Sequence, residues 1–486
     1  MSTLLDKKRW TGRYFDGSWI RAGETIESIE PATGTVLGSV GRVGADELAR
    51  AGRRAKVAGS LWAEAPAQER ARVLRRAAET LEASRDEVAE WITRESGKVR
   101  TATAFELDLA IDELWQAIPL ATKPWGELLP TTQPGRISLA RRVPIGVVAV
   151  IAPWNFPLNL AMRSVAPAIA CGNAVVLKPA SETVVCCGVV IARLFEEAGL
   201  GEGVLHMLPG RGSELGTSFA DDPNVDMISF TGSTPIGKKL DEAAGRNLKK
   251  MVAELGGNNA FVVLDDADVD KAAAAGAFGT FTHQGQICMA TGRHLVAESI
   301  APAYLDAITS IADKMSVGNP LDDVDLGPII NESQVDHIED VVDRTVAAGA
   351  RLRAGGTRDG LFMRPAVLEG VTPDMAAFTE EIFGPVVPVT TFADDDEAVE
   401  LANCTPFGLV AGVHSGSVSR AQSVADRLRA GMVHVNDQTV NDEVPAPFGG
   451  RGDSGAGGRF GALTNLDEFT TWQWMTVRDA QGAIPA

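Results

Sequence analysis

The chain has 486 residues, of which 45% are hydrophobic and 22% charged, a balance typical of a globular protein with a large buried core and roughly three domains. Its net charge of −19 argues against nucleic acid as a partner, because binding a phosphate backbone requires a basic surface. Five cysteines without a CxxC pair and six histidines without ligand spacing predict a reducing compartment, no disulfide framework and no metal site. Residues 1–20 lack the apolar stretch of a secretory signal, so we expect a cytoplasmic protein.

The first long segment with a clear pattern, residues 45–118, is predicted to be helical, because apolar positions recur at helical spacing, as in 70–81. Residues 120–142 are β-prone and fit an arm better than a core. The uncharged stretch 143–162 has the length of a membrane span. Its prolines and asparagines favour a buried strand and turn instead, so no membrane association is expected.

Between residues 147 and 253, short apolar runs alternate with helical segments. Such alternation predicts an α/β fold with a doubly wound parallel sheet, which binds ligands at the carboxyl ends of its strands. The expected strands are 147–152, 174–177, 204–208, 227–230 and 251–253, and the helices between them include 181–198 and 213–220.

A second alternation, from about residue 260 to residue 450, predicts another α/β domain. Its expected helices are 269–281, 301–315, 331–348 and 417–430, and its expected strands include 294–296, 386–392 and 431–435. Residues 467–478 are β-prone and again fit an arm.

Two glycine-rich loops resemble phosphate-binding motifs without matching them. The segment Gly210 to Gly216 has one residue more than the dinucleotide fingerprint, so a strand-to-helix turn is the favoured interpretation and a phosphate contact at Gly212 the alternative. Residues 232–239 nearly match the P-loop, but Lys239 stands where a magnesium-binding Ser or Thr is needed, which disfavours a kinase or an ATPase. This loop still opens a predicted helix, whose free amides favour a pyrophosphate without an obligate metal.

Chemically useful side chains follow four of the predicted strands. Asn155 follows the first strand and can donate a hydrogen bond to an oxyanion, although turn formation alone also explains an asparagine there. Lys178, Ser233 and Glu254 follow later strands, at the sheet edge where nucleotides bind. Cys288 lies 34 positions beyond Glu254 (288 − 254). A thiolate can attack a carbonyl, and a carboxylate can then activate the water that releases the acyl group.

These segments resemble the aldehyde dehydrogenase superfamily over essentially the whole chain. The resemblance rests on motifs in the family's order: Pro153-Trp154-Asn155-Phe156-Pro157, Lys178-Pro179, Phe230-Thr231-Gly232-Ser233, Glu254-Leu255-Gly256-Gly257, Gly285-Gln286-Ile287-Cys288, Glu381-Ile382-Phe383-Gly384-Pro385 and Pro447-Phe448-Gly449-Gly450. It implies a dinucleotide-binding domain over 1–119 and 143–256 and a catalytic domain over 257–450. Residues 120–142 and 451–486 are expected to form an oligomerisation arm and a C-terminal tail, which implies a homodimer or homotetramer.

The resemblance also implies the roles of the site residues. Cys288 is expected to be the nucleophile, Asn155 with the Cys288 amide the oxyanion hole, and Glu254 the base that activates the deacylating water. Lys178 and Glu381 are expected to hold ribose hydroxyls, and Ser233 to cap the helix beneath the pyrophosphate. The expected catalytic residues are Cys288, Glu254, Asn155 and Lys178, and the expected cofactor contacts are Ile151, Pro153, Trp154, Lys178, Ser181, Gly212, Phe230, Gly232, Ser233, Leu255, Glu381 and Phe383. None of Cys171, Cys186, Cys187 and Cys404 is expected to be catalytic.

The cofactor is expected to be NAD or NADP. NAD-preferring relatives commonly carry a glutamate three residues after the lysine of the Lys-Pro motif, and this chain has Ser181 there. Serine does not repel a 2′-phosphate, so we expect NAD to be preferred slightly and NADP to be tolerated.

The segments 282–291 and 434–443 most resemble the benzaldehyde and vanillin dehydrogenase branch, which implies a small aromatic aldehyde as substrate. The implied pocket walls are Phe156, Leu160, Ile287, Met289 and Phe448. Arg163 lies on the same predicted helix, where it either faces the substrate or, as the favoured interpretation, forms an ion pair. One alternative is a broad aliphatic or semialdehyde dehydrogenase, for which Arg163 is the one obvious cation for a distal carboxylate. Another is a catalytically silent family member with a structural or binding role, against which the joint presence of Cys288, Glu254 and Asn155 argues.

Overall fold

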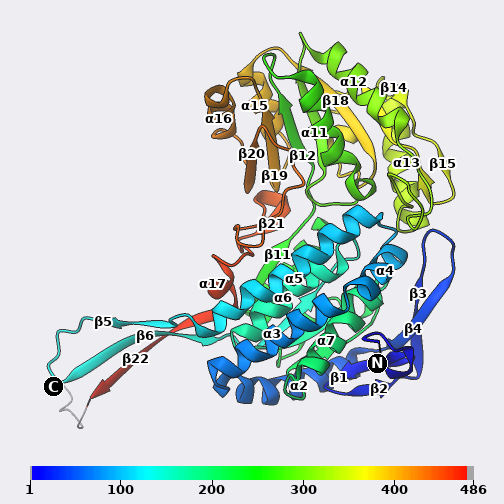
Figure 1. Cartoon of the computed structure of the whole chain (residues 1–486). Coiled ribbons are helices and arrows are strands. Elements are labelled where there is room, and N and C mark those ends of the chain that lie inside the picture. The colour runs from blue at the N-terminus through cyan, green and yellow to red at the C-terminus, as the bar shows by residue number, and fades with distance from the viewer. Residues whose placement is uncertain (1–2, 479–486) are drawn as a thin grey trace.

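The computed structural model describes residues 3–478 and places two large β-sheets in separate lobes (Figure 1). The first sheet has eight strands in the order β2-β1-β9-β8-β7-β10-β11-β21. These strands are β1 (Arg13–Asp16), β2 (Trp19–Arg21), β7 (Val147–Ile151), β8 (Ala174–Lys178), β9 (Leu205–Met207), β10 (Met227–Thr231), β11 (Lys250–Glu254) and β21 (Gly455–Ala456). The strands from β9 to β11 in this order are parallel, which confirms the predicted α/β fold with a doubly wound sheet.

Strand β7 shows why helices cover both faces of this sheet. Its residues Val148 and Val150 pack in a cluster with α3, α5, α6 and α7, whereas Val147 and Ala149 pack on the opposite face with α2 and α10. Alternate side chains of a strand point to opposite faces, so an uninterrupted apolar run is buried on both. The helices of this lobe are α1 (Lys7–Trp10), α2 (Ala45–Glu64), α3 (Ala67–Ala83), α4 (Arg85–Ser96), α5 (Arg100–Thr122), α6 (Pro157–Ala170), a π-helical turn (Val185–Val189), α7 (Val190–Ala198), α8 (Gly212–Leu215), α9 (Ser218–Asp221) and α10 (Thr234–Arg246).

The second sheet has seven strands in the order β14-β17-β18-β13-β12-β19-β20, and its pairs are parallel except at the β14 edge. Its strands are β12 (Asn259–Val263), β13 (Thr291–Ala297), β14 (Arg351–Ala354), β17 (Ala366–Glu369), β18 (Val386–Phe392), β19 (Val410–His414) and β20 (Met432–Val435). Its helices are α11 (Val269–Phe281), α12 (Ala301–Lys314), α13 (Glu332–Ala347), α14 (Ala376–Thr379), α15 (Asp395–Asn403) and α16 (Val418–Ala425). Helix α16 ends at Ala425 and not at the predicted residue 430, because the amides of Arg427 and Leu428 bond three residues back in tighter turns.

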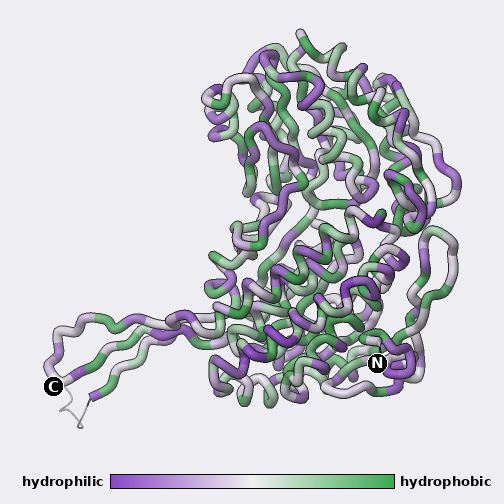
Figure 2. Tube along the Cα trace, in the orientation of Figure 1, coloured by the Kyte–Doolittle hydropathy of each residue, from purple (hydrophilic) through white to green (hydrophobic). Residues whose placement is uncertain are grey.

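The arm is a three-stranded antiparallel sheet that projects from the first lobe (Figure 1). Strand β6 (Arg136–Pro144) lies between β5 (Gly126–Leu129) and β22 (Thr470–Arg478). Hydrophobic and hydrophilic residues are interleaved along it (Figure 2). Helix α17 (Asn465–Phe469) precedes β22, and the last part of the predicted tail, 479–486, lies outside the described residues. The proposed domain boundaries stay a prediction.

Two further features bear on the sequence-based expectations. Strands β3 (Glu24–Ile29) and β4 (Val36–Arg42) form a separate hairpin, and β15 (Arg358–Asp359) pairs with β16 (Phe362–Met363); neither pair was predicted. The uncharged stretch 143–162 is divided between β6, β7 and α6. Within residues 3–478, no helix combines the length and the apolar character needed to cross a membrane.

Candidate active site

A cleft of about 490 Å³ opens where the carboxyl ends of β7, β10 and β11 face the second lobe. Asn155 follows β7, Ser233 follows β10 and Glu254 ends β11, while Cys288 reaches the same cleft from the second lobe. The remaining lining residues are Pro153, Trp154, Leu160, Thr231, Gly232, Thr234, Pro235, Leu255, Gly256, Gln334, His337, Thr379, Glu380, Glu381, Phe383 and Phe407. The structure therefore brings the thiol, the carboxylate and the amide of the sequence motifs to one cavity.

The side chain of Asn155 ties the turn after β7 to the cysteine loop. Its Nδ2 donates a hydrogen bond to the carbonyl oxygen of Gln286 at 2.9 Å, and the residue is 4% exposed. This bond uses one of two N–H groups, so the second is available to a substrate oxygen. The turn itself is held by Glu106 of α5, whose Oε1 accepts from the amides of Leu158 and Asn159 at 2.8 and 3.3 Å. These amides belong to the first turn of α6, where carboxylates are favoured.

Glu254 is a buried carboxylate whose two oxygens make no hydrogen bond of normal geometry among the described residues, although the Gly450 amide lies near enough to favour its ionised form. Burial raises its pKa to about 8, although the charges of Arg459 and Arg163 oppose the shift. A carboxylate with a pKa near the working pH suits proton transfer to and from water. Gly449 packs directly against this carboxylate, because a Cβ at position 449 would lie 2.8 Å from Glu254 Oε1.

Cys288 follows a turn with unusual backbone geometry. His283, Gln284 and Gly285 have consecutive φ values of 49°, 58° and 72°, and the first two are non-glycine residues in the left-handed region. Tertiary contacts hold this conformation. Gln284 Nε2 donates to the carbonyl oxygens of Gly97 and Pro328 at 3.1 and 2.8 Å. The strained turn places Cys288 among the residues that line the cleft.

Asn259 secures the other side of the cysteine loop and was not singled out from the sequence. Its Nδ2 donates to the carbonyl oxygens of Cys288 and Ala290 at 2.8 and 2.7 Å. No sequence signal beyond its place after the Glu254–Gly257 motif distinguishes it, because the contact joins β12 to a loop about thirty positions away.

The ionisation of Cys288 is costly in this environment. Burial, together with the carboxylates of Glu381 and Glu254, raises the pKa of the thiol to about 12, and Arg163 opposes this weakly. The thiol is therefore protonated at neutral pH, and attack on a carbonyl requires that it first lose this proton.

The opposite end of the cleft fits a dinucleotide. Ser233 occupies the N-cap position of α10, but its hydroxyl makes no capping hydrogen bond, so the capping bond expected from the sequence is absent. The first amides of α10 are left without that partner, and such amides bind phosphate oxygens. Trp154 and Phe383 stack edge to face with ring centroids 5.5 Å apart. Phe383 has a φ of 52°, and Gln334 Nε2 donates to its carbonyl oxygen at 3.4 Å.

Glu381 explains the two glycines of the Glu254–Gly257 motif. Its Oε1 accepts a hydrogen bond from the Gly257 amide at 2.8 Å, and burial raises its pKa to about 7. A Cβ at Gly256 would lie 2.2 Å from Glu381 Oε2, so a larger residue there would displace the carboxylate. Glu381 is thus fixed on the second-lobe side of the cleft that it lines.

The remaining predicted cofactor residues lie behind or beside the cleft. Lys178 ends β8 next to β7, and its Nζ donates to the carbonyl oxygen of Pro179 at 3.2 Å; burial lowers its pKa. Ser181 is half-buried, and Gly212 is the first residue of α8. These three residues do not line the cleft, whereas Leu255 does. Ile151 and Phe230 are strand residues of β7 and β10 directly behind it.

The predicted substrate-pocket residues form one apolar cluster beside Cys288. Phe156, Leu160, Ile287, Met289 and Phe448 pack together, with Cys288 half-buried against them. The cluster is completed by residues that the sequence did not indicate, namely Leu409, Val410, Val440, Phe105, Ala290 and Met432.

Arg163 lies behind this cluster and forms ion pairs. The sequence favours an ion pair over a contact with the substrate, and the structure confirms the ion pair. Its Nε donates to Glu113 Oε1 at 3.0 Å and its Nη2 to Asp442 Oδ2. The guanidinium carbon lies 4.4 Å from the centroid of the Phe448 ring.

The other four cysteines do not line the cleft. Cys171, Cys186 and Cys187 are buried, and burial raises the pKa of each thiol. Cys404 is exposed at the end of α15, where its thiol donates to the carbonyl oxygen of Leu401.

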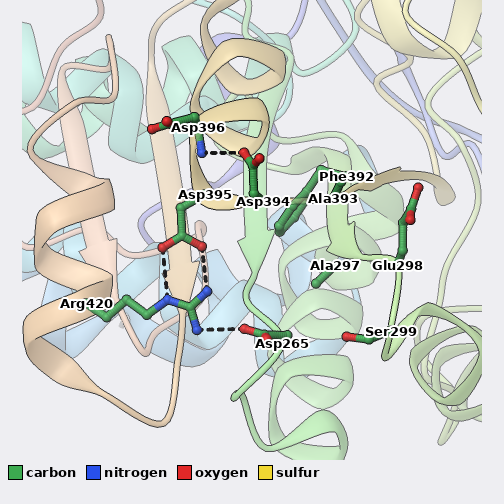
Figure 3. Close-up of a pocket in the computed structure, with 10 residues that line it drawn as sticks. All are labelled: Asp265, Ala297, Glu298, Ser299, Phe392, Ala393, Asp394, Asp395, Asp396 and Arg420. Carbon is green, nitrogen blue, oxygen red and sulfur yellow. Dashed lines mark hydrogen bonds and ion pairs between the residues drawn. The ribbon is translucent and has the colours of Figure 1, made fainter.

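A second hollow, of about 830 Å³, lies in the second lobe and shares no residue with the cleft. Figure 3 shows that Arg420 pairs with Asp395 and Asp265, while the Asp394 carboxylate accepts from the Asp396 amide. The arginine is therefore neutralised within the hollow, and none of the described residues that line it bears a thiol.

Comparisons with known proteins agree with the geometry of the cleft. The profile of the aldehyde dehydrogenase family matches residues 19–475. A vanillin dehydrogenase of Amycolatopsis sp. is 49% identical over 99% of this chain and 100% of its own length. The NAD(+) benzaldehyde dehydrogenase of Pseudomonas putida is 46% identical over the full length of both chains. The crystal structure of Staphylococcus aureus betaine aldehyde dehydrogenase with NAD+ superposes with a TM-score of 0.94 at 32% identity, covering 99% of this chain and 97% of that one.

Proposed function

Because this chain belongs to the aldehyde dehydrogenase family and is an NAD(P)-dependent enzyme of that family, we propose that its substrate is an aromatic aldehyde such as benzaldehyde, which it oxidises to the carboxylic acid. The observation that carries the proposal is the apolar cluster of Phe156, Ile287, Met289 and Phe448 directly beside the Cys288 thiol. An aromatic ring is largely apolar, and its burial there is favourable. The identity with vanillin and benzaldehyde dehydrogenases supports the same substrate class.

In the proposed reaction, the Cys288 thiol first gives its proton to water in the cleft, and the resulting thiolate attacks the aldehyde carbon and forms a thiohemiacetal. The free N–H of Asn155 and the Cys288 amide stabilise its oxyanion, a contribution of about 3–4 kcal/mol per donor in comparable sites. A nicotinamide cofactor, when bound, accepts the hydride that this carbon releases. The acyl group then remains on Cys288 as a thioester.

Glu254 is proposed to complete the cycle. Its ionised carboxylate takes a proton from water, and the hydroxide attacks the thioester carbonyl. The C–S bond breaks, the acid leaves and the Cys288 thiolate is restored. Burial keeps the pKa of Glu254 at about 8, so a proton taken from water is held more readily than by an exposed glutamate.

The cofactor is proposed to lie between the α10 amides and the aromatic pair, with Lys178 and Glu381 at its riboses. Ser181 is half-buried and carries no charge, so it does not repel a 2′-phosphate. A slight preference for NAD with tolerance of NADP follows. The P. putida relative is a benzaldehyde dehydrogenase named for NAD(+).

The test is a panel of aromatic, aliphatic and carboxylated aldehydes followed by absorbance at 340 nm with each cofactor. We expect kcat/KM for benzaldehyde to exceed that for a short aliphatic aldehyde by about 10-fold or more, because an aromatic ring buries more apolar area. NAD and NADP are expected to support turnover with less than about a 10-fold difference. Equal or better oxidation of aliphatic aldehydes would contradict the aromatic assignment but leave the enzyme class intact.

We further propose a cytoplasmic homo-oligomer, a dimer or a dimer of dimers, assembled through the arm. The supporting observation is the set of apolar side chains that the arm exposes, among them Leu128, Ile137, Trp472 and Trp474, at 73, 49, 52 and 68%. A small sheet is marginally stable in water unless its faces or edges find a partner.

Sedimentation velocity checks this arrangement. We expect the parent protein to sediment as a dimer or tetramer of the 51.3 kDa chain. Replacing Trp472 and Trp474 with serine should shift the population towards monomer, since large exposed aromatic residues dominate interface energies. The control is Leu248→Ser, because Leu248 is 95% exposed on the loop after α10 and belongs to none of the arm's three strands. A parent that sediments as a monomer would contradict the proposal.

A further inference from the structure

The substrate cluster has a charged group behind its apolar wall. Arg163 of α6 is held between Glu113 of α5 and Asp442 of the loop after β20, and the three side chains are 4, 1 and 5% exposed. Phe448, a wall of the substrate cluster, lies against the guanidinium at 4.4 Å. A cation therefore lies one side chain away from the space proposed for the aromatic ring.

The positive charge of Arg163 is outweighed by the two carboxylates that pair with it, Glu113 and Asp442. With both carboxylates ionised, the three side chains carry a net charge of −1 (+1 − 1 − 1). Burial raises the pKa of Glu113 to about 7, so this net negative charge develops as pH rises through about 7. Each carboxylate engages a different nitrogen, Nε for Glu113 and Nη2 for Asp442, while Nη1 is buried and has no hydrogen-bond partner among the described residues. Arg163 thus keeps a free donor but no unbalanced positive charge.

The charges of Arg163 and Asp442 act on the two residues proposed to react, Glu254 and Cys288. Arg163 opposes the raised pKa values of both Glu254 and Cys288, and Asp442 raises that of Cys288. A second charge on a bound substrate would lie in the same low-dielectric surroundings, where uncompensated charges are costly.

We propose that Asp442, by neutralising Arg163 together with Glu113, is a specificity-determining residue that bars aldehydes carrying a carboxylate and so reserves the pocket for uncharged aromatic aldehydes. This inference rests on the proposed function, which seats the aromatic ring against the apolar cluster that Phe448 shares with Cys288. A substrate carboxylate meets a cluster whose positive charge is already paired, and like charge in a buried site is rejected strongly. Without the Asp442 charge, Arg163 stays paired with Glu113 at a net charge of zero (+1 − 1), and its Nη1 and Nη2 are both free to bind an anionic substrate.

The test compares benzaldehyde with 4-formylbenzoate, which differs from it by one ring carboxylate. We expect the parent to prefer benzaldehyde, and Asp442→Asn to raise the kcat/KM ratio of 4-formylbenzoate to benzaldehyde by about 10-fold or more. Asp442→Glu, which keeps the charge, should keep the parent ratio. The double variant Asp442→Asn with Arg163→Met should lose the gain, because the unmasked cation is gone.

The matched control is Glu443→Gln, which removes the same charge from the adjacent, exposed residue. A gain in Glu443→Gln equal to that in Asp442→Asn, or no gain in Asp442→Asn, would overturn the inference. If Asp442→Asn folds but turns over too slowly, quenching of tryptophan fluorescence by terephthalate and by benzoate gives the same comparison from binding alone. If Asp442→Asn does not fold, Asp442→Ser replaces it in both measurements.

The inference and the proposed function fail in different ways. A parent enzyme that oxidises no aromatic aldehyde contradicts the proposed function before any variant is made. A parent that oxidises benzaldehyde and 4-formylbenzoate equally well contradicts the inference about Asp442 alone.

Discussion

Replacing Cys288 with alanine is expected to lower kcat for aldehyde oxidation by about 10⁴-fold or more, because Cys288 is the one thiol among the described residues that line the cleft and the covalent acyl intermediate forms on it. The other side chains that line the cleft near it, Asn155 and Glu254 among them, bear no thiol. Cofactor binding is expected to survive, since the α10 amides and the Trp154–Phe383 pair are independent of the thiol. The measurements are steady-state absorbance at 340 nm and calorimetric titration with NAD.

The control for this variant is Cys404→Ala, which removes an exposed thiol outside the cleft and should retain the parent rate. Thermal unfolding of both variants shows whether they keep the fold. Retention of turnover within 10-fold of the parent by Cys288→Ala, in a folded protein, would remove Cys288 from the chemistry.

Glu254→Gln is expected to slow release of the acyl group by about 10²–10⁴-fold while leaving hydride transfer nearly unchanged, because glutamine cannot take a proton from water. Rapid mixing should then show a burst of reduced cofactor equal to the concentration of active sites, followed by slow turnover. The same measurement on the parent should show a smaller burst or none.

The pH dependence of the acyl-release rate in the parent enzyme also tests Glu254 as the base. The carboxylate acts as a base only when ionised, and its pKa is raised to about 8, so the acyl-release rate should rise with pH through about 8. Glu254→Gln should lose this rise.

The same raised pKa affects the free energy of unfolding. The pKa of Glu254 rises from 4.5 to about 8 on folding, so its contribution to that free energy is fully present below about pH 4.5 and is lost as pH rises through about 8.

Glu380→Gln is the matched control, because Glu380 also lines the cleft but pairs with Arg344 at the surface. It should show neither the burst nor the altered pH profile. An unchanged steady-state rate in Glu254→Gln would assign the deacylating base elsewhere.

Much of the architecture could be predicted from local pattern. The buried run of β7 is apolar at every position and faces helices on both sides, which is the signature of a doubly wound sheet. Parallel strands end at one edge, so residues after β7, β10 and β11 had to meet there, and they do. The hairpin β3–β4 was missed, because its short strands have mixed exposure and no continuous apolar run.

The hydrogen-bond partners of individual side chains could not be predicted in the same way. Ser233 stands where a capping serine was expected, yet its hydroxyl makes no such bond. Asn259 holds the cysteine loop by two bonds to carbonyl oxygens that no sequence motif marks. In both cases the hydrogen-bond partner is chosen by the arrangement of distant backbone groups.

The sequence by itself therefore determined the α/β character of both lobes, the doubly wound parallel order of the first sheet and the strand ends at which Asn155, Ser233 and Glu254 stand. Periodicity and motif order are local properties, and they suffice for these features. The roles of Cys288, Glu254 and Asn155 stay predictions. Only the tertiary structure decided the electrostatic state of the site. Burial in the folded protein raises the pKa values of Glu254 and Cys288. The ion pairs of Arg163 with Glu113 and Asp442 join residues 50 and 279 positions apart. Burial and charge pairing depend on distances through space, which spacing along the chain does not determine.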